Sequence, residues 1–216
     1  SHESKAKYYE AVRKSLTTDN PVAPWSIFEK YGYIPNDVGE LFSVSKTLEM
    51  AYAHGCAALL VKKMIPLDKE KYNFHFTRSQ YYKNVFDIKS GFFRGKNSNG
   101  QFTGPFDPNV TNENEFVEAT PWQYLFHVQH DVDEMIAMMG GKERFIERLD
   151  ALFLAEKGKI DDHILDITGL IGQYAHGNEP SHHVTYLYNY AGEPWKTQEK
   201  IRRVTRPGTS SRPVRG

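Results

Sequence analysis

The sequence contains only one cysteine, Cys56, which excludes an internal disulfide and leaves the redox compartment open. It has no run of about 18 apolar residues that could span a membrane, and the start SHESKAKYYEAV lacks the order of a signal peptide. The 27 lysines and arginines balance the 27 aspartates and glutamates, so no overall charge favours nucleic acid or an anionic membrane. We therefore expect a soluble protein with a neutral ligand. We also expect an inert, buried thiol, because its surroundings, HGCAALL, are apolar.

Helical periodicity dominates the chain, whose 216 residues suffice for one large domain. Helices are predicted over about residues 3–17, 45–64 and 68–87, and Asp68 opens the last of them. The second is apolar nearly all round, which predicts that neighbouring helices cover it. The predicted fold class is all-α.

Residues from about 91 to 119 interrupt this pattern with a long Gly-, Asn- and Pro-rich stretch. Such a stretch predicts one irregular loop with at most short strands. A helix start follows it, because Thr120, Pro121 and Gln123 supply an N-cap, a first-turn proline and a capping box. An apolar face then predicts one continuous helix up to the Gly140 stop. The members of that face are Leu125, Val128, Val132, Ile136 and Met139.

Three further helices and a tail complete the predicted order. KERFIERLDALFL forms a helix after the Gly-Gly stop, another runs from a cap at Asn178 or Glu179 to about Tyr190, and Pro194 opens the last. The segment 205–216, TRPGTSSRPVRG, has three arginines, no acid and almost nothing to bury. It predicts a disordered or non-native tail behind a domain of residues 1–204.

An acid shortly before a helix-opening proline recurs at Glu118, Glu179 and Glu193. Helix chemistry alone explains Glu193, because acids and prolines both favour the first turn of a helix. Glu118 and Glu179 are each followed by side chains able to bind a polyhydroxylated ligand, and aromatic rings can stack on sugar faces. These side chains are Trp122 and Gln123 after the first acid, and His182 and His183 after the second.

The motif HGNEPSHH also raises the question of a metal site. His182 and His183 are adjacent, so they point about 100° apart on a helix and do not form the zinc pair of a His-Glu-x-x-His motif. His176 precedes the predicted cap. Two more histidines, His127 and His130, are spaced to share one face of the helix opened by Pro121, with His127 nearer to Glu118 in the sequence. Structural, ligand-binding and zinc-binding roles all stay open at this point.

Four blocks of the sequence are distinctive when taken together. They are VEATPWQYLFHVQHDVDEMIAMMGGKERFIERLDALF, DITGLIGQYAHGNEPSHHVTYLYNYAGEPWKTQEKIRRV, YGYIP with SVSKTLEMAYAHGCAALLVKKM, and RSQYYKNVFDIKSGFFRGKNSNGQFTGPFDP. Over about residues 7–204, in one register, they resemble glycoside hydrolase family 92, the calcium-dependent exo-acting α-mannosidases. The resemblance implies part of an (α/α)6 toroid of helical hairpins, an inverting mechanism and Ca²⁺. The calcium ligands cannot be assigned from this sequence, because side-chain and backbone oxygens both serve.

The resemblance also implies roles for individual residues. In the block E-x-x-x-W-Q-Y, Glu118 matches the general acid that protonates the leaving oxygen. The GNEPSHH block resembles a wall of the sugar site, with Glu179 and His182 as the main candidates. For Glu118 to be protonated near neutral pH, burial against Trp122 must outweigh the nearby helix N-terminus. The full set of substrate-binding candidates is Trp122, Gln123, Asn178, Glu179, His182 and His183.

Two departures from the family pattern bear on activity. Ala119, Thr120 and Pro121 follow the acid where many members have a glycine, which suggests a different leaving group or specificity. The family's water-activating aspartates belong to a GN-D/E-D block beyond KTQEKIRRV, where this sequence has TRPGTSSRPVRG. We therefore expect a fragment of an α-mannosidase that is inactive or weakly active alone, and that associates with the rest of its catalytic domain or with itself.

A mannose-containing glycan is the partner that the resemblance implies, with a secreted, periplasmic or cell-surface location and no nucleic acid or membrane partner. Two alternatives stay open. One is a non-catalytic helical carbohydrate-binding or interaction protein, which would bind without turnover. The other is a zinc-dependent hydrolase built on His176, His182 and His183, which would carry stoichiometric zinc.

Overall fold

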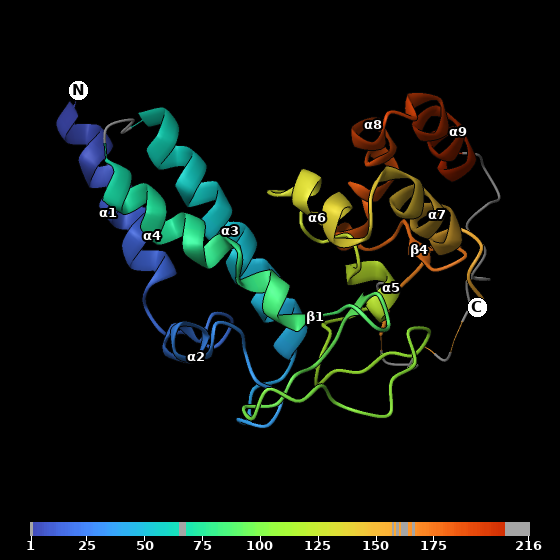
Figure 1. Ribbon diagram of the computed structural model, residues 1–216, viewed down its shortest axis with the longest axis horizontal. Coiled ribbons are helices and arrows are strands. Elements are labelled where there is room, and N and C mark those ends of the chain that lie inside the picture. Colours follow the sequence, from blue (N-terminus) through green and yellow to red (C-terminus); the bar gives the residue numbers. More distant parts are fainter. Residues whose placement is uncertain are drawn as a thin grey trace.

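Helix α3 (Ser43–Met64) packs against α1 (His2–Leu16) and α4 (Lys69–Ser79), and the three helices form an arm on one side of the molecule. The computed structural model describes residues 2–64, 68–156, 158, 160, 164–165 and 167–205. Figure 1 shows the arm on the left, helices α5 to α9 on the right, and the long irregular segment beneath them. Of the tail predicted at 205–216, only Thr205 is described, and residues 206–216 lie outside the described residues.

The first three predicted helices are confirmed, with one shortened. Helices α1 and α3 lie within two residues of their predicted bounds, and the Asp68 carboxylate accepts the Lys71 N–H at 2.9 Å as the cap of α4. Helix α4 ends at Ser79, eight residues early, and a 3₁₀ helix, η1 (Tyr81–Val85), continues the chain. Because the helix ends early, the side chains of Gln80 and Tyr82 both reach Asp131 and donate hydrogen bonds to it. A continuous helix would not bring both side chains to Asp131.

Neighbouring helices cover only part of α3. Its residues Val44, Leu48 and Val61 are fully buried, whereas Leu59 keeps 50% of its surface exposed. The buried thiol predicted for Cys56 is wrong, because this side chain is exposed. The apolar residues next to Cys56 in the sequence therefore did not indicate which side of the helix faces the core.

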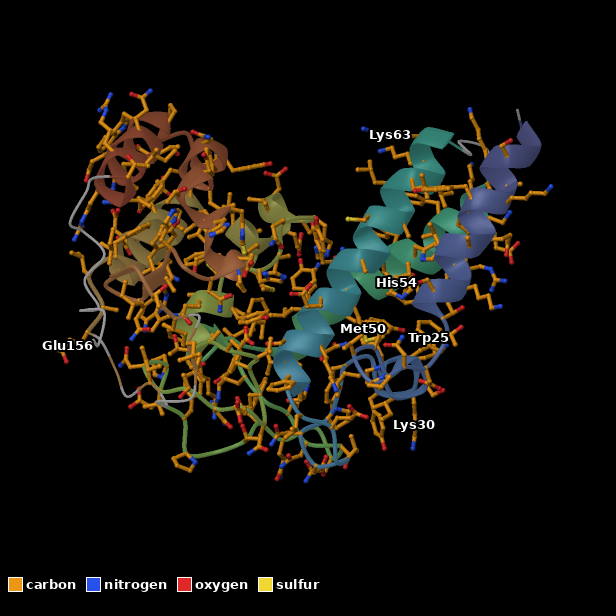
Figure 2. All side chains as sticks on the ribbon, turned by 180° about the vertical axis from the view of Figure 1, so that it is seen from behind. Trp25, Lys30, Met50, His54, Lys63 and Glu156 are labelled. Carbon is orange, nitrogen blue, oxygen red and sulfur yellow. The ribbon has the colours of Figure 1, made fainter. Side chains whose placement is uncertain are left out.

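A short helix, α2 (Trp25–Tyr31), precedes α3 and closes a second, smaller core. Phe28, Ile34 and Met50 form that core, and Figure 2 shows Trp25, Met50 and His54 gathered where α2 meets α3. Packing at this corner is aromatic, since the Phe28 and His54 rings stack with centroids 6.0 Å apart. It fixes the lower end of the arm.

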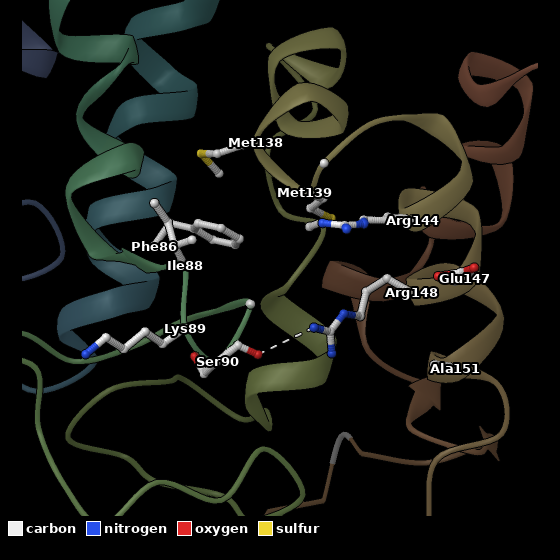
Figure 3. A pocket seen from close by; sticks show the side chains of 12 residues that line it. Phe86, Ile88, Lys89, Ser90, Met138, Met139, Arg144, Glu147, Arg148 and Ala151 are labelled. Carbon is white, nitrogen blue, oxygen red and sulfur yellow. Dashed lines mark hydrogen bonds between the residues drawn. The ribbon is translucent and has the colours of Figure 1, made fainter.

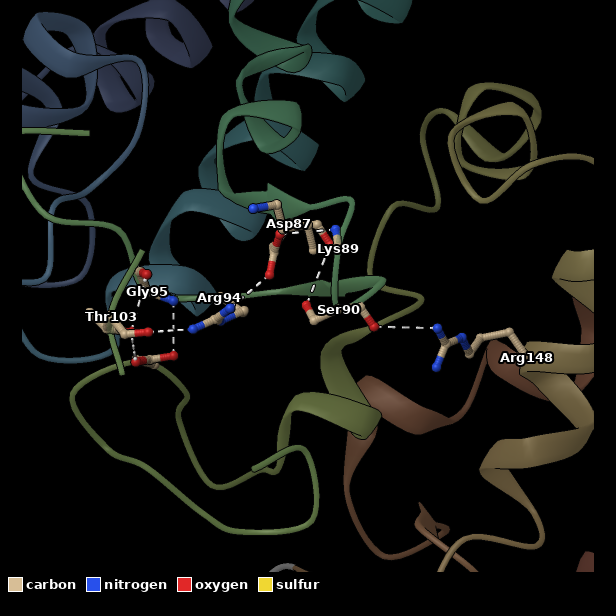
Figure 4. A network of polar contacts seen from close by, with 8 residues as sticks. Asp87, Lys89, Ser90, Arg94, Gly95, Thr103 and Arg148 are labelled. Carbon is tan, nitrogen blue, oxygen red and sulfur yellow. Dashed lines mark hydrogen bonds and ion pairs between the residues drawn. The ribbon is translucent and has the colours of Figure 1, made fainter. Parts of the chain in front are cut away.

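The irregular segment predicted at about 91–119 is present and is tied down by a buried acid. It begins in a small antiparallel hairpin, β1 (Phe86–Asp87) with β2 (Phe92–Phe93). The Glu115 carboxylate is 4% exposed and accepts the Gly95 N–H at 2.8 Å and the Thr103 hydroxyl at 2.6 Å. Figure 4 shows this network together with Arg94. A long loop stays ordered here because its polar groups are satisfied internally.

Arg94 links the hairpin to the loop. Its guanidinium pairs with Asp87 at 2.7 Å and also donates to the Thr103 carbonyl (Figure 4). The Asp87 carboxylate is only 6% exposed, and its hydrogen bonds with Arg94 and the 89–90 turn hold its pKa below the usual value against the opposing effect of burial. The pair therefore fastens β1 to the loop that leads to residue 118.

The capping box at Thr120 is confirmed, but the long helix predicted after it is wrong. The structure has α5 (Pro121–Tyr124) and α6 (Val132–Met138), with non-helical backbone between them. Tertiary contacts explain the break: the His130 ring donates to the Ser79 carbonyl at 2.9 Å, and Asp131 accepts hydrogen bonds from Gln80 and Tyr82. The residues of the predicted apolar face are still mostly buried. The apolar pattern therefore predicted burial correctly, although the backbone is not one continuous helix.

Helix α7 (Lys142–Leu152) and helix α9 (Pro194–Val204) confirm the predictions made from the Gly-Gly stop and from Pro194. The helix predicted from residue 178 to 190 is wrong as one element. It divides into shorter turns because His183, in its middle, is drawn to the Phe126 carbonyl. The pieces are η2 (Glu179–Ser181), η3 (Val184–Tyr186) and α8 (Tyr188–Ala191), preceded by the hairpin β3 (Leu170–Ile171) with β4 (Tyr174–Ala175).

Helices make up most of the regular structure, and one large core joins the two sides of the molecule. That core runs from Leu48 in α3 through Phe93 and Leu125 to Tyr188 in α8. No helix within the described ranges is both long enough and apolar enough to cross a membrane.

Candidate active site

Glu118 lies at the end of the long loop, two residues before the cap of α5. Its side chain is exposed, while Ala119 and Thr120 directly after it are buried. Its φ is +50°, and in the described part of the chain only one other non-glycine residue, Phe42, has a positive φ. Left-handed backbone at a residue with a Cβ is strained, and it persists only where the surroundings hold it.

Three hydrogen bonds hold the backbone around Glu118. The Val117 N–H donates to the Ser45 hydroxyl of α3 at 3.1 Å, and the Asn178 carboxamide donates to the Glu118 carbonyl at 2.8 Å. The Thr120 N–H donates to the Gln123 carboxamide at 2.9 Å. Three separate segments thus fix the peptide groups on both sides of an exposed carboxylate, which is how a strained conformation is maintained.

Asn178 comes from the GNEPSHH motif and is 4% exposed. The structure places Asn178 beside Glu118, but the Asn178 side chain contacts the main-chain carbonyl of Glu118 rather than its carboxylate. Its Nδ2 atom is the donor, so this nitrogen serves the protein itself. In this arrangement Asn178 is a positioning residue for the acid.

Gln123 is buried, and both ends of its carboxamide are used inside the protein. The oxygen accepts the Thr120 N–H, and the nitrogen donates to the Gln173 carbonyl at 3.2 Å. The Thr120 hydroxyl also donates to the Gln173 side chain at 3.1 Å. The capping box therefore joins α5 to the β3–β4 hairpin.

Trp122 is 8% exposed and packs edge-on against Phe92, with ring centroids 4.8 Å apart. Its Nε1 donates to Asn109 at 3.1 Å, and the Arg148 guanidinium lies 5.7 Å from its ring. The predicted burial of Glu118 against Trp122 is not found, because Glu118 is exposed in the structure.

Arg148 borders a groove of about 460 Å³ between the β1–β2 turn and α7. Figure 3 shows its guanidinium reaching from α7 towards Ser90, whose carbonyl lies 3.4 Å away. Burial lowers the pKa of Arg148, and the faces of Phe92 and Trp122 lie beside the cation. The Arg148 side chain therefore helps to hold the Trp122 ring in place.

The paired histidines of the motif have different surroundings. The exposed His182 donates its Nε2–H to the His176 carbonyl at 2.9 Å, and the two rings lie 5.3 Å apart. His183 donates its Nε2–H to the Phe126 carbonyl at 2.8 Å, and burial lowers its pKa to about 4. Both Nε2 atoms thus face carbonyl oxygens. Glu179 is exposed at the first position of η2.

The sequence reasoning missed a second carboxylate, which belongs to the helix whose Ser45 bonds to Val117 beside Glu118. Glu49 is on α3, one helical turn after Ser45, and its Oε1 is 2.9 Å from Nε2 of His127. The Tyr124 hydroxyl is buried nearby, and burial raises its pKa. The charges of Glu49 and Glu118 raise it further, so both acids lie within electrostatic range of this hydroxyl. No short-range pattern around Glu49 could have revealed this contact.

The fit of these residues to a metal can be tested from the donor atoms. Ca²⁺ takes six to eight oxygen ligands and zinc takes four nitrogen, sulfur or oxygen ligands. Within the described residues no group of three or more His, Cys, Asp or Glu side chains comes together in a way that could hold an ion. Side chains of these four types in the described part of the chain therefore do not by themselves supply a complete metal site.

Comparison with known proteins finds matches along most of the chain. A family model described as the glycosyl hydrolase family 92 catalytic domain matches residues 2–211. A protein of Arthroderma benhamiae, described as an uncharacterized secreted glycosidase, is 30% identical over 225 residues, which cover 86% of this chain and 26% of that protein.

Two solved structures have a similar fold. A family 92 α-mannosidase from Bacteroides thetaiotaomicron, in complex with mannoimidazole, superposes with a TM-score of 0.83 at 37% identity, over 93% of this chain and 27% of that one. A family 92 inverting mannosidase from strain VPI-5482 of the same species gives 0.78 at 29% identity, over 93% and 28%. The chain thus spans about a quarter of the length of its relatives. The predicted fold class, part of an (α/α)6 toroid, is confirmed.

Proposed function

Because this chain belongs to glycoside hydrolase family 92, we propose that it forms part of the catalytic domain of an exo-acting α-mannosidase that inverts configuration. One observation carries the proposal: Glu118 presents an exposed carboxylate on a strained backbone that three separate segments hold in place. Strain kept in place by surrounding hydrogen bonds is common at active sites. The substrate is a glycan with terminal α-linked mannose.

Glu118 is the general acid. Its protonated carboxyl gives a proton to the glycosidic oxygen as the bond from that oxygen to C1 of the mannose breaks. Water adds to C1 from the opposite face and loses a proton to a separate carboxylate, so one water is consumed and mannose is released with inverted configuration. Among the predicted contacts, Glu179 and His182 are exposed and suit binding of the sugar's hydroxyl groups.

Four of the predicted substrate-binding residues act chiefly by holding the site. The polar side-chain atoms of Gln123, Asn178 and His183, and the indole N–H of Trp122, all bond within the protein. Trp122 and Gln123 support the turn after the acid. Asn178 and His183 support it from the GNEPSHH motif.

The carboxylates that activate water come from protein outside this sequence. On this proposal the chain is an incomplete catalytic domain, which the family model matches as far as residue 211, and it has little or no hydrolytic activity alone. A bound Ca²⁺ would help to hold the sugar's hydroxyl groups. Within the described residues no three His, Cys, Asp or Glu side chains come together as candidate ligands for it. The location is secreted, periplasmic or cell-surface.

Release of mannose from an aryl α-mannoside tests the function. The whole protein that contains this chain is expected to hydrolyse the mannoside, and Glu118→Gln is expected to slow release by about 10²-fold or more, as loss of a general acid does. Chelation of calcium should stop the reaction and added Ca²⁺ restore it. Glu70→Gln, on the exposed side of α4, is the matched control.

Three other results would favour the alternatives or contradict these roles. Binding of mannosides without turnover by the whole protein would favour a carbohydrate-binding protein. Stoichiometric zinc would favour a zinc hydrolase. Unchanged turnover in Glu118→Gln would remove this residue as the acid.

A further inference from the structure

Besides Glu118, a second carboxylate belongs to the helix that packs beside the turn at residue 118. It is Glu49 on α3, and the proposed mechanism does not use it. Ser45 on α3 accepts the Val117 N–H at 3.1 Å, so the first turns of α3 lie directly beside the segment that carries Glu118. Glu49 follows Ser45 by four residues and therefore projects from the same face of α3. Its side chain keeps 50% of its surface exposed, so it can meet a ligand.

His127 fixes the orientation of the Glu49 carboxylate. Nε2 of His127 lies 2.9 Å from Oε1 of Glu49, and the His127 side chain is only 8% exposed. With one oxygen directed to the buried ring, the other oxygen and the remaining lone pairs are left on the exposed side. A half-exposed glutamate on a surface helix normally samples many rotamers, whereas this one is held from within.

The proton on His127 is placed by a chain of contacts that begins in the GNEPSHH motif. Nε2 of Gln129 lies 3.4 Å from Nδ1 of His127 and 3.4 Å from Nδ1 of His183. Because a carboxamide nitrogen is a donor, both Nδ1 atoms are acceptors and both rings carry their proton on Nε2. That assignment lets His183 donate to the Phe126 carbonyl at 2.8 Å, and it places the protonated Nε2 of His127 2.9 Å from Oε1 of Glu49, a close contact rather than a well-aligned hydrogen bond.

The same motif therefore serves both acids. Asn178, at its start, holds the Glu118 carbonyl, and His183, at its end, holds Glu49 through Gln129 and His127. We propose that Glu49 is a sugar-binding carboxylate of the same site, which accepts hydrogen bonds from hydroxyl groups of the mannose unit bound beside Glu118, with His127 as its positioning residue. The inference rests on the proposed function and adds a substrate contact to it.

Hydroxyl groups are good donors to an ionised carboxylate, and such charge-assisted bonds are stronger than neutral ones. The electrostatics of the Tyr124 hydroxyl agree with this placement, because burial raises its pKa, a hydrogen bond with Ser45 lowers it, and the charges of Glu49 and Glu118 raise it. A purely structural role for Glu49, as the partner of a buried imidazole, predicts loss of stability without loss of sugar affinity. The two roles can therefore be separated by measuring both quantities.

Titration of mannoimidazole into the full protein by calorimetry tests the inference, because this compound is the ligand bound to a related α-mannosidase. Glu49→Gln keeps the size of the side chain and is expected to weaken binding about tenfold or more, as loss of a charged hydrogen bond does. The thermal midpoint should stay near that of the wild type. Glu49→Asp keeps the charge but withdraws it by one methylene, and it should bind with intermediate affinity.

Glu70→Gln, an exposed acid on α4, is the matched control and should bind like the wild type. Wild-type affinity in both Glu49 variants would overturn this inference and leave the proposed function standing. If Glu49→Gln does not fold, Glu49→Asp decides: wild-type affinity overturns the inference and weaker binding supports it. A wild-type protein that binds no mannoimidazole would overturn the proposed function and this inference with it.

Discussion

The Nδ1 atoms of His54 and His75 lie 2.9 Å apart in the interior of the helical arm, where both side chains are 0% exposed. Tyr9 of α1 bonds to the other nitrogen of His75 at 3.2 Å, so one short chain of contacts connects α1, α4 and α3. Only one of the two facing nitrogens can carry the proton of their hydrogen bond, and burial of both rings disfavours the charged form of either histidine.

Acid should loosen the arm. Burial, then the neighbouring charges of His75 and Arg78, lower the pKa of His54 to about 3, and burial lowers the pKa of His75 to about 4. Since both folded-state values lie below the unfolded value of about 6.5, the stabilisation is complete above that pH. It is lost as the pH falls towards 4, by roughly 3 kcal/mol for a single buried histidine. Urea unfolding at a series of pH values between 7.5 and 4 measures it.

Two variants provide the controls for this pH dependence. His54→Phe keeps an aromatic ring beside Trp25 and Phe28 and should flatten the pH dependence, while His182→Gln, at an exposed position, should not. An unchanged slope in His54→Phe would contradict the role of the pair.

The strained turn at Glu118 predicts that a substitution which removes the strain raises the stability of the protein and also removes its activity. With φ at +50°, Glu118→Gly should relieve strain, whereas Glu118→Ala keeps the Cβ that causes it. We expect the glycine variant to be more stable than the alanine variant by about 1 kcal/mol, while both lose hydrolysis. Chemical denaturation of the two variants gives the difference. Equal stability, or a less stable glycine variant, would show that the turn stores no strain.

Gln123 should behave as a structural residue. Gln123→Ala removes the acceptor of the buried Thr120 N–H and the donor to Gln173, and an unpaired buried polar group costs about 1–3 kcal/mol. The exposed Gln198 of α9 provides the comparison, because Gln198→Ala should change stability by less than about 0.5 kcal/mol. Thermal unfolding of both variants is the measurement. A stable Gln123→Ala protein with weaker sugar binding would instead indicate a direct contact.

Gly91, in the groove beside α7, can be compared with Gly100, which lies elsewhere in the irregular segment. A Cβ added to Gly91 would lie 2.4 Å from Nη2 of Arg148, whereas one added to Gly100 meets nothing within 4 Å. Their φ values are +71° and +83°, so alanine is strained at both positions by about 1 kcal/mol. Gly91→Ala should therefore lose more stability than Gly100→Ala, by the cost of moving Arg148 off the Phe92 and Trp122 rings. Similar losses at the two positions would mean that Arg148 moves away without cost.

Local sequence signals predicted the elements that local chemistry decides. The Asp68 cap, the Thr120 capping box and the Gly140 stop all lie where their residue types indicated, because each depends on contacts within a few residues. The long helix after Thr120 was wrong for the opposite reason. Ser79 and Tyr82, about fifty residues away in sequence, bind His130 and Asp131 and pull the backbone out of the helix.

The residues of the candidate site also fall into two groups, those that a local motif revealed and those that only the tertiary structure revealed. Glu118 and Asn178 stood out because each belongs to a motif, and the structure brings them together. Ser45 and Glu49 lie in a helix whose local pattern indicated only packing, and their closeness to Glu118 depends on how α3 meets the loop. Periodicity along one element carries no information about contacts between elements.

The bonds that hold Glu118 join residues 72 and 60 positions apart in the chain. Bringing such distant segments together requires large loops to close, so we expect these bonds to form late in folding. The left-handed turn at Glu118 has no reason to exist before that point. A protein interrupted within the 91–119 segment should keep much of its helix content and yet present no organised acid, which makes an intact loop a requirement for chemistry rather than for helical structure.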